Sequence, residues 1–476
     1  MYFRKTTNLI CLILFTQILL NAQEINGWTI MHYAVGSNSS EVDLLNDMNE
    51  MRIGKTSEGY EVITLIDRTP GFSEDSTVLG ENFTDTRLYR FNNENFERLN
   101  GHEFLPQIRI NQSHDLEMGD AAVLKNFIQY CKHYFPAKHY MLVLRSHGNG
   151  VGMCPDAESG INDKLYPGEL RDVLSGNESV DILGLDVCSM AGLENFYEWR
   201  PNNEDQFSAD YIIASAPLSA AWAYDQIFNR LQVDNNKNID LDNNYFSPGP
   251  ERTMNPYHMN ALEFSKIILE EIYDNQAWAS WGLFDNSQID HIKRKIDELS
   301  RLLPNEEDDV ILDIIQNTLG YYHNTNNNLE IAQLTSPYID AYHFYELIAQ
   351  NININNASRQ LASEVCEAID QFVIYSYCGR GFLPNTEVFQ DGKNGVYQII
   401  PIGNKVFSQT NRSFWSHTTW FHPDDKSNEQ NSYGLYDWCK DGASRGNNKI
   451  ENFFEYLDYL FDKDSSATGG VNKYRY

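Results

Sequence analysis

Short apolar segments alternate with stretches of helical periodicity across the first half of this 476-residue chain. This alternation restricts the fold more than any other feature of the sequence. Strand-like runs lie at 28–34, 62–67, 88–91, 140–144, 182–187 and 211–215, and apolar residues recur at helical spacing in segments between them, such as 44–51 and 120–134. Strands separated by helices predict an α/β fold, a three-layer α/β/α sandwich with a mostly parallel central sheet.

The length exceeds what one compact core usually holds, so we expect further parts beyond this sheet. Helical spacing continues to residue 349 and again from 358 to 375, and the carboxy-terminal end is rich in aromatic residues that we expect to pack in a core. The predicted parts are an α/β core at 23–228, an Asn/Asp/Pro-rich loop or insertion at 229–256, a helical continuation at 257–350 and an aromatic-rich carboxy-terminal subdomain at 351–476.

The amino terminus has the pattern of a signal peptide. Arg4 and Lys5 precede an apolar run at 9–20, and small and polar residues follow from Asn21. The run is too short to span a membrane comfortably, and no later segment reaches the length that a span needs. We therefore expect residues 1–22 to be removed and the mature protein to be secreted, periplasmic or extracellular, without a membrane attachment.

Charge and cysteine content exclude several classes of function. A formal net charge of −31 argues against nucleic acid as a partner, because phosphate binding needs clustered Lys and Arg. Six cysteines remain after the leader, too few for a disulfide scaffold of this length, and their pairing stays open. Neither HExxH nor paired CxxC occurs, so no catalytic metal is predicted. We expect a monomer.

Two reactive side chains follow two of the apolar runs. His147 comes after the run at 140–144, and Cys188 after the run at 182–187. Ligands bind at the carboxyl ends of parallel strands, so the two could face one substrate if these strands are neighbours. An imidazole and a helix amino terminus just after Cys188 would favour the nucleophilic thiolate. The backbone amides of Gly148 and Cys188 could then bind an oxyanion.

Each residue also has a simpler interpretation. A cysteine at a strand end is more often a small buried apolar residue, and a His-Gly pair is usually only a turn. The occurrence of both at one sheet edge leaves the catalytic and structural interpretations about equally supported by the pattern alone.

The segments Ser-His-Gly-Asn-Gly at 146–150 and Leu-Asp-Val-Cys-Ser-Met at 185–190 resemble the two signatures of clostripain-like cysteine peptidases, relatives of caspases, legumains and gingipains. The resemblance extends over about 28–350 and includes the segments 28–31, 118–120, 140–144, 210–215 and 338–340. It implies a caspase-like sheet with helices on both faces, peptide-bond hydrolysis through a thioester, and no organic cofactor.

The resemblance also implies roles for individual residues. Cys188 attacks the scissile carbonyl, and His147 protonates the leaving amine and then activates water. Asp186 matches a carboxylate that lines the pocket for the substrate residue before the cut. A carboxylate in that pocket implies a preference for Arg or Lys. The alternative is that Asp186 is a strand-end residue that caps the next helix. Ser215 ends a matching strand and is a candidate substrate-binding residue. One departure weakens basic specificity, because 216–221 is Ala-Pro-Leu-Ser-Ala-Ala where similar sequences often have acidic residues.

Two loop segments are weaker candidates for sites. Lys164 is a candidate self-cleavage point, since relatives can mature by a cut between the histidine and the cysteine; a solvated loop lysine is the equal alternative. Asp and Asn alternate at 234–242 like calcium ligands, but Ile239 and Tyr245 stand where a calcium loop needs glycine and glutamate. A hydrated loop is therefore favoured over calcium.

The sequence as a whole predicts a secreted cysteine endopeptidase with polypeptide substrates. One alternative is a non-catalytic surface protein that binds polypeptides on a peptidase fold. Another is a different thiol hydrolase, an amidase or transpeptidase. The presence of both His147 and Cys188 argues against a binding-only role, because binding needs neither.

Overall fold

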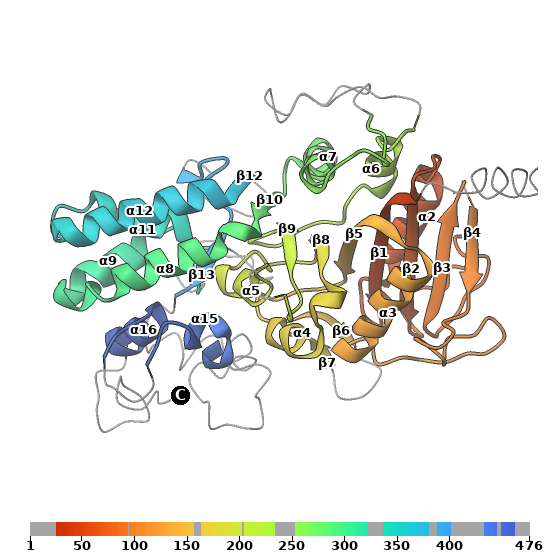
Figure 1. Ribbon diagram of the computed structural model, residues 1–476, viewed down its shortest axis with the longest axis horizontal. Helices are drawn as coiled ribbons and strands as arrows, with labels where there is room; N and C mark the ends of the chain where they lie inside the picture. The colour runs from red at the N-terminus through yellow and green to blue at the C-terminus, as the bar shows by residue number, and fades with distance from the viewer. Residues whose placement is uncertain are drawn as a thin grey trace, which may run out of the picture.

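The computed structural model describes residues 25–93, 95–156, 163–201, 204–233, 253–321, 337–379, 388–400, 433–444 and 449–461. A nine-stranded sheet in the order β12-β10-β9-β8-β5-β1-β2-β3-β4 runs across the molecule (Figure 1). In chain order its strands are β1 (Asn26–Gly36), β2 (Tyr60–Arg68), β3 (Arg87–Asn92), β4 (Asn95–Leu99), β5 (Ala137–Arg145), β8 (Val180–Asp186), β9 (Ala209–Ala214), β10 (Ser280–Asp285) and β12 (Val373–Cys378).

The centre of this sheet is parallel. Strands β2, β1, β5, β8 and β9 run in one direction. At one edge β3 is antiparallel to its neighbours β2 and β4. At the other edge β10 is antiparallel to its neighbours β9 and β12. The central strands are continuous apolar runs because both faces of a parallel sheet are covered. The predicted α/β class with a mostly parallel sheet is confirmed.

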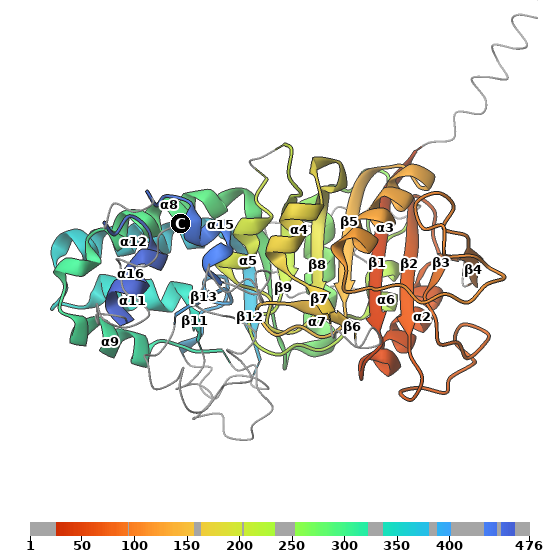
Figure 2. The ribbon, with the colours of Figure 1, turned by 90° about the horizontal axis from the view of Figure 1, so that it is seen from below.

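Helices cover both faces of the sheet (Figure 2). Side chains alternate along each strand, so Met31 and Leu142 enter one core while Ile30 and Met141 enter the other. The first core is completed by α3 (Ala121–Tyr134), α4 (Pro167–Val173) and α5 (Leu193–Glu198), and the second by α2 (Glu41–Gly54), α6 (Tyr224–Asn229) and α7 (Ala261–Gln276).

Further helices extend the molecule past the edge formed by β10 and β12 (Figure 1). They are α8 (Ile289–Ser300), α9 (Asp308–Asn317), α11 (Ala341–Gln350) and α12 (Asn356–Phe372). The predicted helix from 358 to 375 is wrong at its end, because α12 stops at Phe372 and the chain enters β12. The β-branched pair Val373 and Ile374 favours the strand there.

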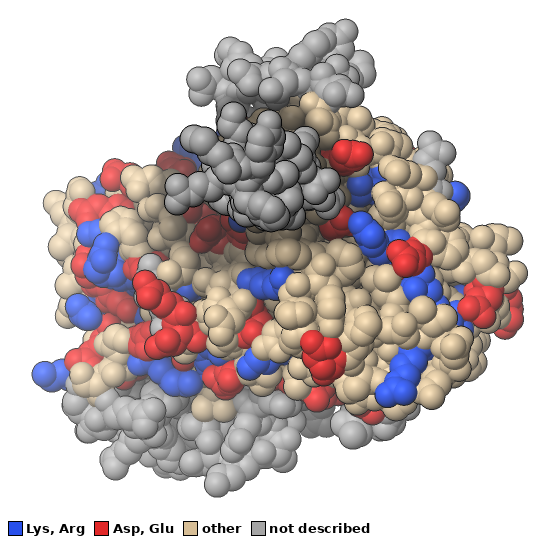
Figure 3. Space-filling model, turned by 45° about the vertical axis from the view of Figure 1, so that its right-hand side comes forward, with Lys and Arg blue, Asp and Glu red and all other residues tan. Residues whose placement is uncertain are grey.

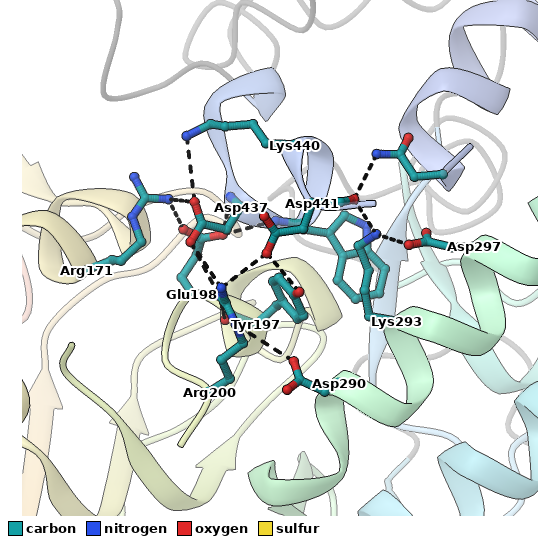
Figure 4. Close-up of polar contacts among 12 residues, drawn as sticks. Arg171, Tyr197, Glu198, Arg200, Asp290, Lys293, Asp297, Asp437, Lys440 and Asp441 are labelled. Carbon is teal, nitrogen blue, oxygen red and sulfur yellow. Dashed lines mark hydrogen bonds and ion pairs between the residues drawn. The ribbon is translucent and has the colours of Figure 1, made fainter. Parts of the chain in front are cut away.

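The carboxy-terminal part packs back on the α/β core. Strand β13 (Tyr397–Ile399) pairs antiparallel with β11 (Tyr338–Asp340), and α15 (Asp437–Lys440) and α16 (Phe453–Phe461) follow. Ion pairs hold α15 against α4 and α5 (Figure 4). Arg171 Nη1 lies 2.8 Å from Asp437 Oδ1 and also pairs with Glu198, and Arg200 Nη2 lies 3.2 Å from Asp441 Oδ2.

Several predictions can be placed against this fold. Trp438 is 1% exposed within the first core, as expected of a core aromatic residue. Phe414, Trp415, Trp420 and Phe421 lie outside the described residues, as does the leader at 1–22. Among the described residues no helix is long and apolar enough to cross a membrane. The division of the chain into parts stays a prediction.

Candidate active site

The turns after β5 and β8 meet at the carboxyl edge of the sheet. The two strands are parallel neighbours, with Arg145 opposite Asp186. His147 lies two residues after Arg145, and Cys188 lies two residues after Asp186. Adjacent strands are about 4.8 Å apart. The turns themselves are in contact, because a Cβ on Gly148 would lie 2.4 Å from the carbonyl oxygen of Cys188. The structure therefore brings into contact the two turns that carry the predicted nucleophile, base and oxyanion-site residues.

Cys188 lies in a tight turn, and the helix starts later than predicted. Ser189 has φ +58°, a left-handed conformation that costs a non-glycine residue energy and is common at functional sites. Its N–H donates to the carbonyl of Pro217 at 2.8 Å, which fixes the turn. Helix α5 begins only at Leu193 and has six residues, so we correct the expectation that a helix amino terminus follows directly after Cys188.

The half-buried Cys188 thiol is covered by the segment after β9. The N–H of Ser219 donates to Sγ at 3.4 Å, and its hydroxyl lies 3.7 Å from the same sulfur. A thiolate accepts such hydrogen bonds more strongly than a thiol, because charge assists the bond. Ser219 therefore provides polar contacts at the point where we expect a nucleophilic anion.

The imidazole of His147 is exposed and is held by a serine of another strand end. Its Nε2 shares a 2.8 Å hydrogen bond with Oγ of Ser39, in the turn after β1. Crowding by protein atoms and the nearby Arg145 guanidinium lower the pKa of His147 below its usual value, while the Asp43 carboxylate acts in the opposite direction. The lowered pKa favours the neutral imidazole, the form that can accept a proton.

A buried ionic cluster lies directly beneath the two turns. Arg145 Nε is 2.7 Å from Asp47 Oδ2 and 3.2 Å from Asp186 Oδ2. The hydroxyl of Tyr224 donates to Asp186 at 2.9 Å, and the N–H of Trp222 does so at 3.3 Å. Burial raises the pKa of Asp47 to about 8, against the attraction of Arg145, because one guanidinium serves two carboxyl groups. Burial also raises the pKa of Asp186.

Asp186 and Ser215 lie beside the nucleophile, but their side chains make internal contacts. The Asp186 side chain is 1% exposed and belongs to the ionic cluster. Ser215 is fully buried, its hydroxyl donates to the carbonyl of Pro217 at 3.2 Å, and its own carbonyl accepts from Ala191 at 3.0 Å. In this conformation both residues shape the turn around Cys188. Their predicted contacts with substrate stay predictions.

The candidate self-cleavage residue Lys164 is ordered. It lies in β7 (Asp163–Leu165), which pairs with β6 (Met153–Asp156), and it is 9% exposed. A cut after Lys164 would require β7 to detach. Six cysteines are free within the described residues. No group of three or more His, Cys, Asp or Glu is arranged there to hold a metal ion, and the candidate calcium segment at 234–242 falls outside those residues.

Three contact residues of the site were not found by reasoning from the sequence. Ser39 had a usable signal, because it follows a strand whose carboxyl end lies at the same edge as His147. Ser219 follows β9 in the same way, and β9 is a parallel neighbour of β8, the strand that precedes Cys188. Tyr397, which contacts both turns, gave no local signal because it lies 208 residues from Ser189.

Comparisons with known proteins show the family and the fold. A model of the clostripain family matches residues 32–463. Clostripain of Hathewaya histolytica is 33% identical over 94% of this chain and 89% of its own. An inactive C11 protease zymogen of Parabacteroides distasonis shares the fold with a TM-score of 0.52, at 13% identity over 83% of this chain and 97% of that one.

A second solved structure shares the fold. It is a secreted C11 cysteine protease of Bacteroides thetaiotaomicron in complex with an irreversible peptide inhibitor. The TM-score is 0.50, at 17% identity over 82% of this chain and 98% of that one. The family match covers nearly the whole chain, and both solved structures share the fold. This chain is therefore a cysteine peptidase that belongs to the clostripain family.

Proposed function

We propose that this peptidase cleaves internal peptide bonds with Cys188 as nucleophile and His147 as acid and base. The observation that carries the proposal is the register of β5 and β8, which puts the two residues at equivalent positions beyond neighbouring strand ends. Parallel strand ends at the centre of an α/β sheet are the usual place for such chemistry. The two residue types form an established kind of nucleophile and base pair.

The proposed reaction has two stages. The Cys188 thiolate attacks the scissile carbonyl carbon, and the backbone N–H groups of Gly148 and Cys188 stabilise the negative charge that develops on its oxygen. The His147 imidazolium gives its proton to the leaving amine as the C–N bond breaks, which leaves a thioester. His147 then takes a proton from water, whose oxygen displaces the sulfur and releases the acid product. This chemistry uses no cofactor.

Substrate entry would have to replace two existing contacts. The His147 ring bonds Ser39, and the Cys188 sulfur bonds Ser219. Both partners lie on turns at the same edge, so small rotations of side chains and of the 216–223 segment would bring ring and thiol to a common substrate. Exchange of one hydrogen bond for another keeps the net energy change small.

Preference for Arg or Lys before the cut is supported by the charge balance at this edge. Asp47 and Asp186 face a single buried cation, Arg145, and the exposed Asp43 adds a further carboxylate close enough to influence His147. The Arg145 cluster is close to neutral, because burial raises the pKa of Asp47 to about 8, whereas the exposed Asp43 carboxylate can attract a cationic side chain. Because Asp186 is already paired, we assign the preference to Asp43 and not to a free carboxylate at a pocket floor.

The same charge balance favours polypeptides over nucleic acids as partners. Asp and Glu are interspersed with Lys and Arg on the face shown in Figure 3, and the chain carries a net charge of −31. Export is supported by the leader pattern at 1–22 and by a structural relative described as secreted. We propose that the enzyme works outside the cytoplasm on extended polypeptide segments, as a monomer.

A peptide-library digest tests the proposal. Wild type and Cys188→Ala are incubated in parallel with a mixture of defined peptides, and products are identified by mass spectrometry. We expect internal cuts after Arg and Lys with wild type and none with Cys188→Ala. Transfer products would identify a transpeptidase, and release of side-chain ammonia alone would identify an amidase. Intact peptides with tight binding would identify a binding protein.

A further inference from the structure

Strand β13, in the carboxy-terminal part, lies against the turn that carries Cys188. The N–H of Tyr397 donates to the carbonyl of Ala191 at 2.9 Å. Its ring packs so closely on Gly192 that a Cβ there would lie 2.4 Å from it. Tyr397 itself is fully buried. A segment distant in the chain thus forms one wall of the turn after the nucleophile.

The Tyr397 hydroxyl lies between the two turns of the site. Its oxygen is 2.9 Å from the carbonyl oxygen of Ser189 and 3.0 Å from that of Gly150. Ser189 directly follows Cys188 in the chain, and Gly150 lies three residues after His147. One side chain therefore contacts the backbone of both turns.

Asn195 completes this bridge. Its Nδ2 is 3.0 Å from the Tyr397 oxygen, 3.1 Å from the carbonyl of Gly150 and 3.3 Å from that of Met190. The amide has two protons and the hydroxyl one, so three protons are shared among three carbonyl oxygens and the hydroxyl oxygen at this point. Burial raises the pKa of Tyr397 well above its usual value, so the hydroxyl keeps its proton and can donate.

A second tyrosine supports the histidine turn from the paired strand. Tyr338 in β11 donates to the carbonyl of Asn149 at 2.6 Å. A Cβ on Gly150 would lie 2.0 Å from the Tyr338 oxygen, and Gly150 has φ +91°, so only glycine fits there. The β11 and β13 pair thus restrains the backbone after His147 as well as the backbone after Cys188.

We propose that Tyr397 is a positioning residue, whose hydroxyl ties the His147 turn to the Cys188 turn and so sets the spacing of imidazole and thiol. This inference rests on the proposed roles of His147 and Cys188. Side-chain spacing is decisive because a displacement of about 1 Å can slow an enzyme by about a hundredfold. The carboxy-terminal part would then contribute to catalysis as well as to stability.

The experiment compares Tyr397→Phe with Tyr345→Phe. Each change removes one buried hydroxyl. The Tyr345 hydroxyl donates at 2.6 Å to Gln398, the neighbour of Tyr397 in β13. It touches neither turn, so Tyr345→Phe is the matched control. We measure kcat and KM on one cleaved peptide, and melting temperature. We expect kcat of Tyr397→Phe to fall about tenfold or more, with KM within about twofold, while Tyr345→Phe keeps wild-type kcat. The melting temperatures of the two should fall alike.

Other outcomes decide against the inference. A kcat for Tyr397→Phe within twofold of wild type, or an equal loss in Tyr345→Phe, overturns it. If Tyr397→Phe does not fold, Asn195→Leu removes the amide that holds the Tyr397 hydroxyl and the Gly150 carbonyl together. That variant is expected to show the same selective loss of kcat, and wild-type kcat in it would also overturn the proposal. Cys188→Ala is run alongside, and activity in that variant would instead refute the proposed function.

Discussion

Arg145 and Asp186 form a 3.2 Å ion pair across two neighbouring parallel strands, and each stands two residues before a proposed catalytic residue. Asp47 of α2 pairs with the same guanidinium at 2.7 Å. The cluster therefore links the ends of β5 and β8 to a helix on one face of the sheet. It fixes the base of both turns without contact to His147 or Cys188.

Loss of the Arg145 cation should destabilise the fold strongly. Arg145→Met leaves two carboxyl groups buried without their cation, and removal of one partner from a buried ion pair costs about 3–5 kcal/mol. We expect a fall of that size in the free energy of unfolding, measured by urea denaturation. The matched control is Arg90→Met: Arg90 binds Glu61 at 2.8 Å with its side chain 31% exposed, so about 1 kcal/mol or less should be lost. Equal losses would contradict the argument.

Asp43 should tune the proton affinity of His147. Its carboxylate favours the imidazolium and so raises the pKa of His147, against the larger lowering by burial and Arg145. Asp43→Asn should therefore lower that pKa further, which NMR titration of the ring in a Cys188→Ala background would measure. Because leaving-group protonation needs the imidazolium, the alkaline limb of kcat/KM should move to lower pH. The exposed Asp172, replaced by Asn, is the control and should leave both unchanged.

Gly150 should tolerate no side chain, for two separable reasons. Its φ of +91° disfavours alanine by about 1 kcal/mol, and a Cβ would also collide with the Tyr338 hydroxyl. Gly392 has φ +77° with nothing within 4 Å of a Cβ, so Gly392→Ala incurs only the first cost. We expect Gly150→Ala to lose a further 1–3 kcal/mol, roughly, from overpacking and most activity. Denaturation and peptide cleavage measure the two effects; equal behaviour of the variants would refute the steric part.

The central strands and the shared sheet edge of the His147 and Cys188 turns could be predicted because their signals are local. Each strand is a continuous apolar run, and alternation with helices makes neighbouring strands parallel, which brings their carboxyl ends to one edge. The same reasoning extends to Ser39, which follows β1. Strand β12 was missed because its apolar residues continue the helical spacing of α12, and only its β-branched start indicates a change.

Contacts between distant segments could not be predicted in this way. Nothing near Tyr397 in the sequence indicates that its hydroxyl reaches Ser189, 208 residues away. The pairing of Arg145 with Asp186 also needed the strand order, because a strand-end carboxylate looks the same in sequence whether it faces a pocket or a buried cation. Because Asp186 is buried and paired, we explain basic specificity by the other charges at the same edge of the sheet and not by this residue.

The attachment of the carboxy-terminal part should weaken as pH rises. Glu194 in α5 accepts hydrogen bonds from the N–H of Ile399 at 2.8 Å and from the hydroxyl of Tyr433 at 2.9 Å. Burial raises its pKa to about 7 from an ordinary value of 4.5, although these hydrogen bonds act to lower it. The folded state therefore holds this proton more tightly than the unfolded state, and stability is lost as pH rises from about 4.5 through about 7.

Glu194→Gln removes this titration while keeping the shape of the side chain. In a Cys188→Ala background, which prevents self-digestion, the free energy of unfolding of the Gln variant relative to its parent should rise between pH 5 and pH 8. The expected rise is on the order of 3 kcal/mol at most. Other buried carboxyl groups titrate in both proteins and cancel in the difference. The exposed Glu117, replaced by Gln, serves as control and should show no such trend. A difference that stays constant with pH would mean that Glu194 is already ionised in the folded protein.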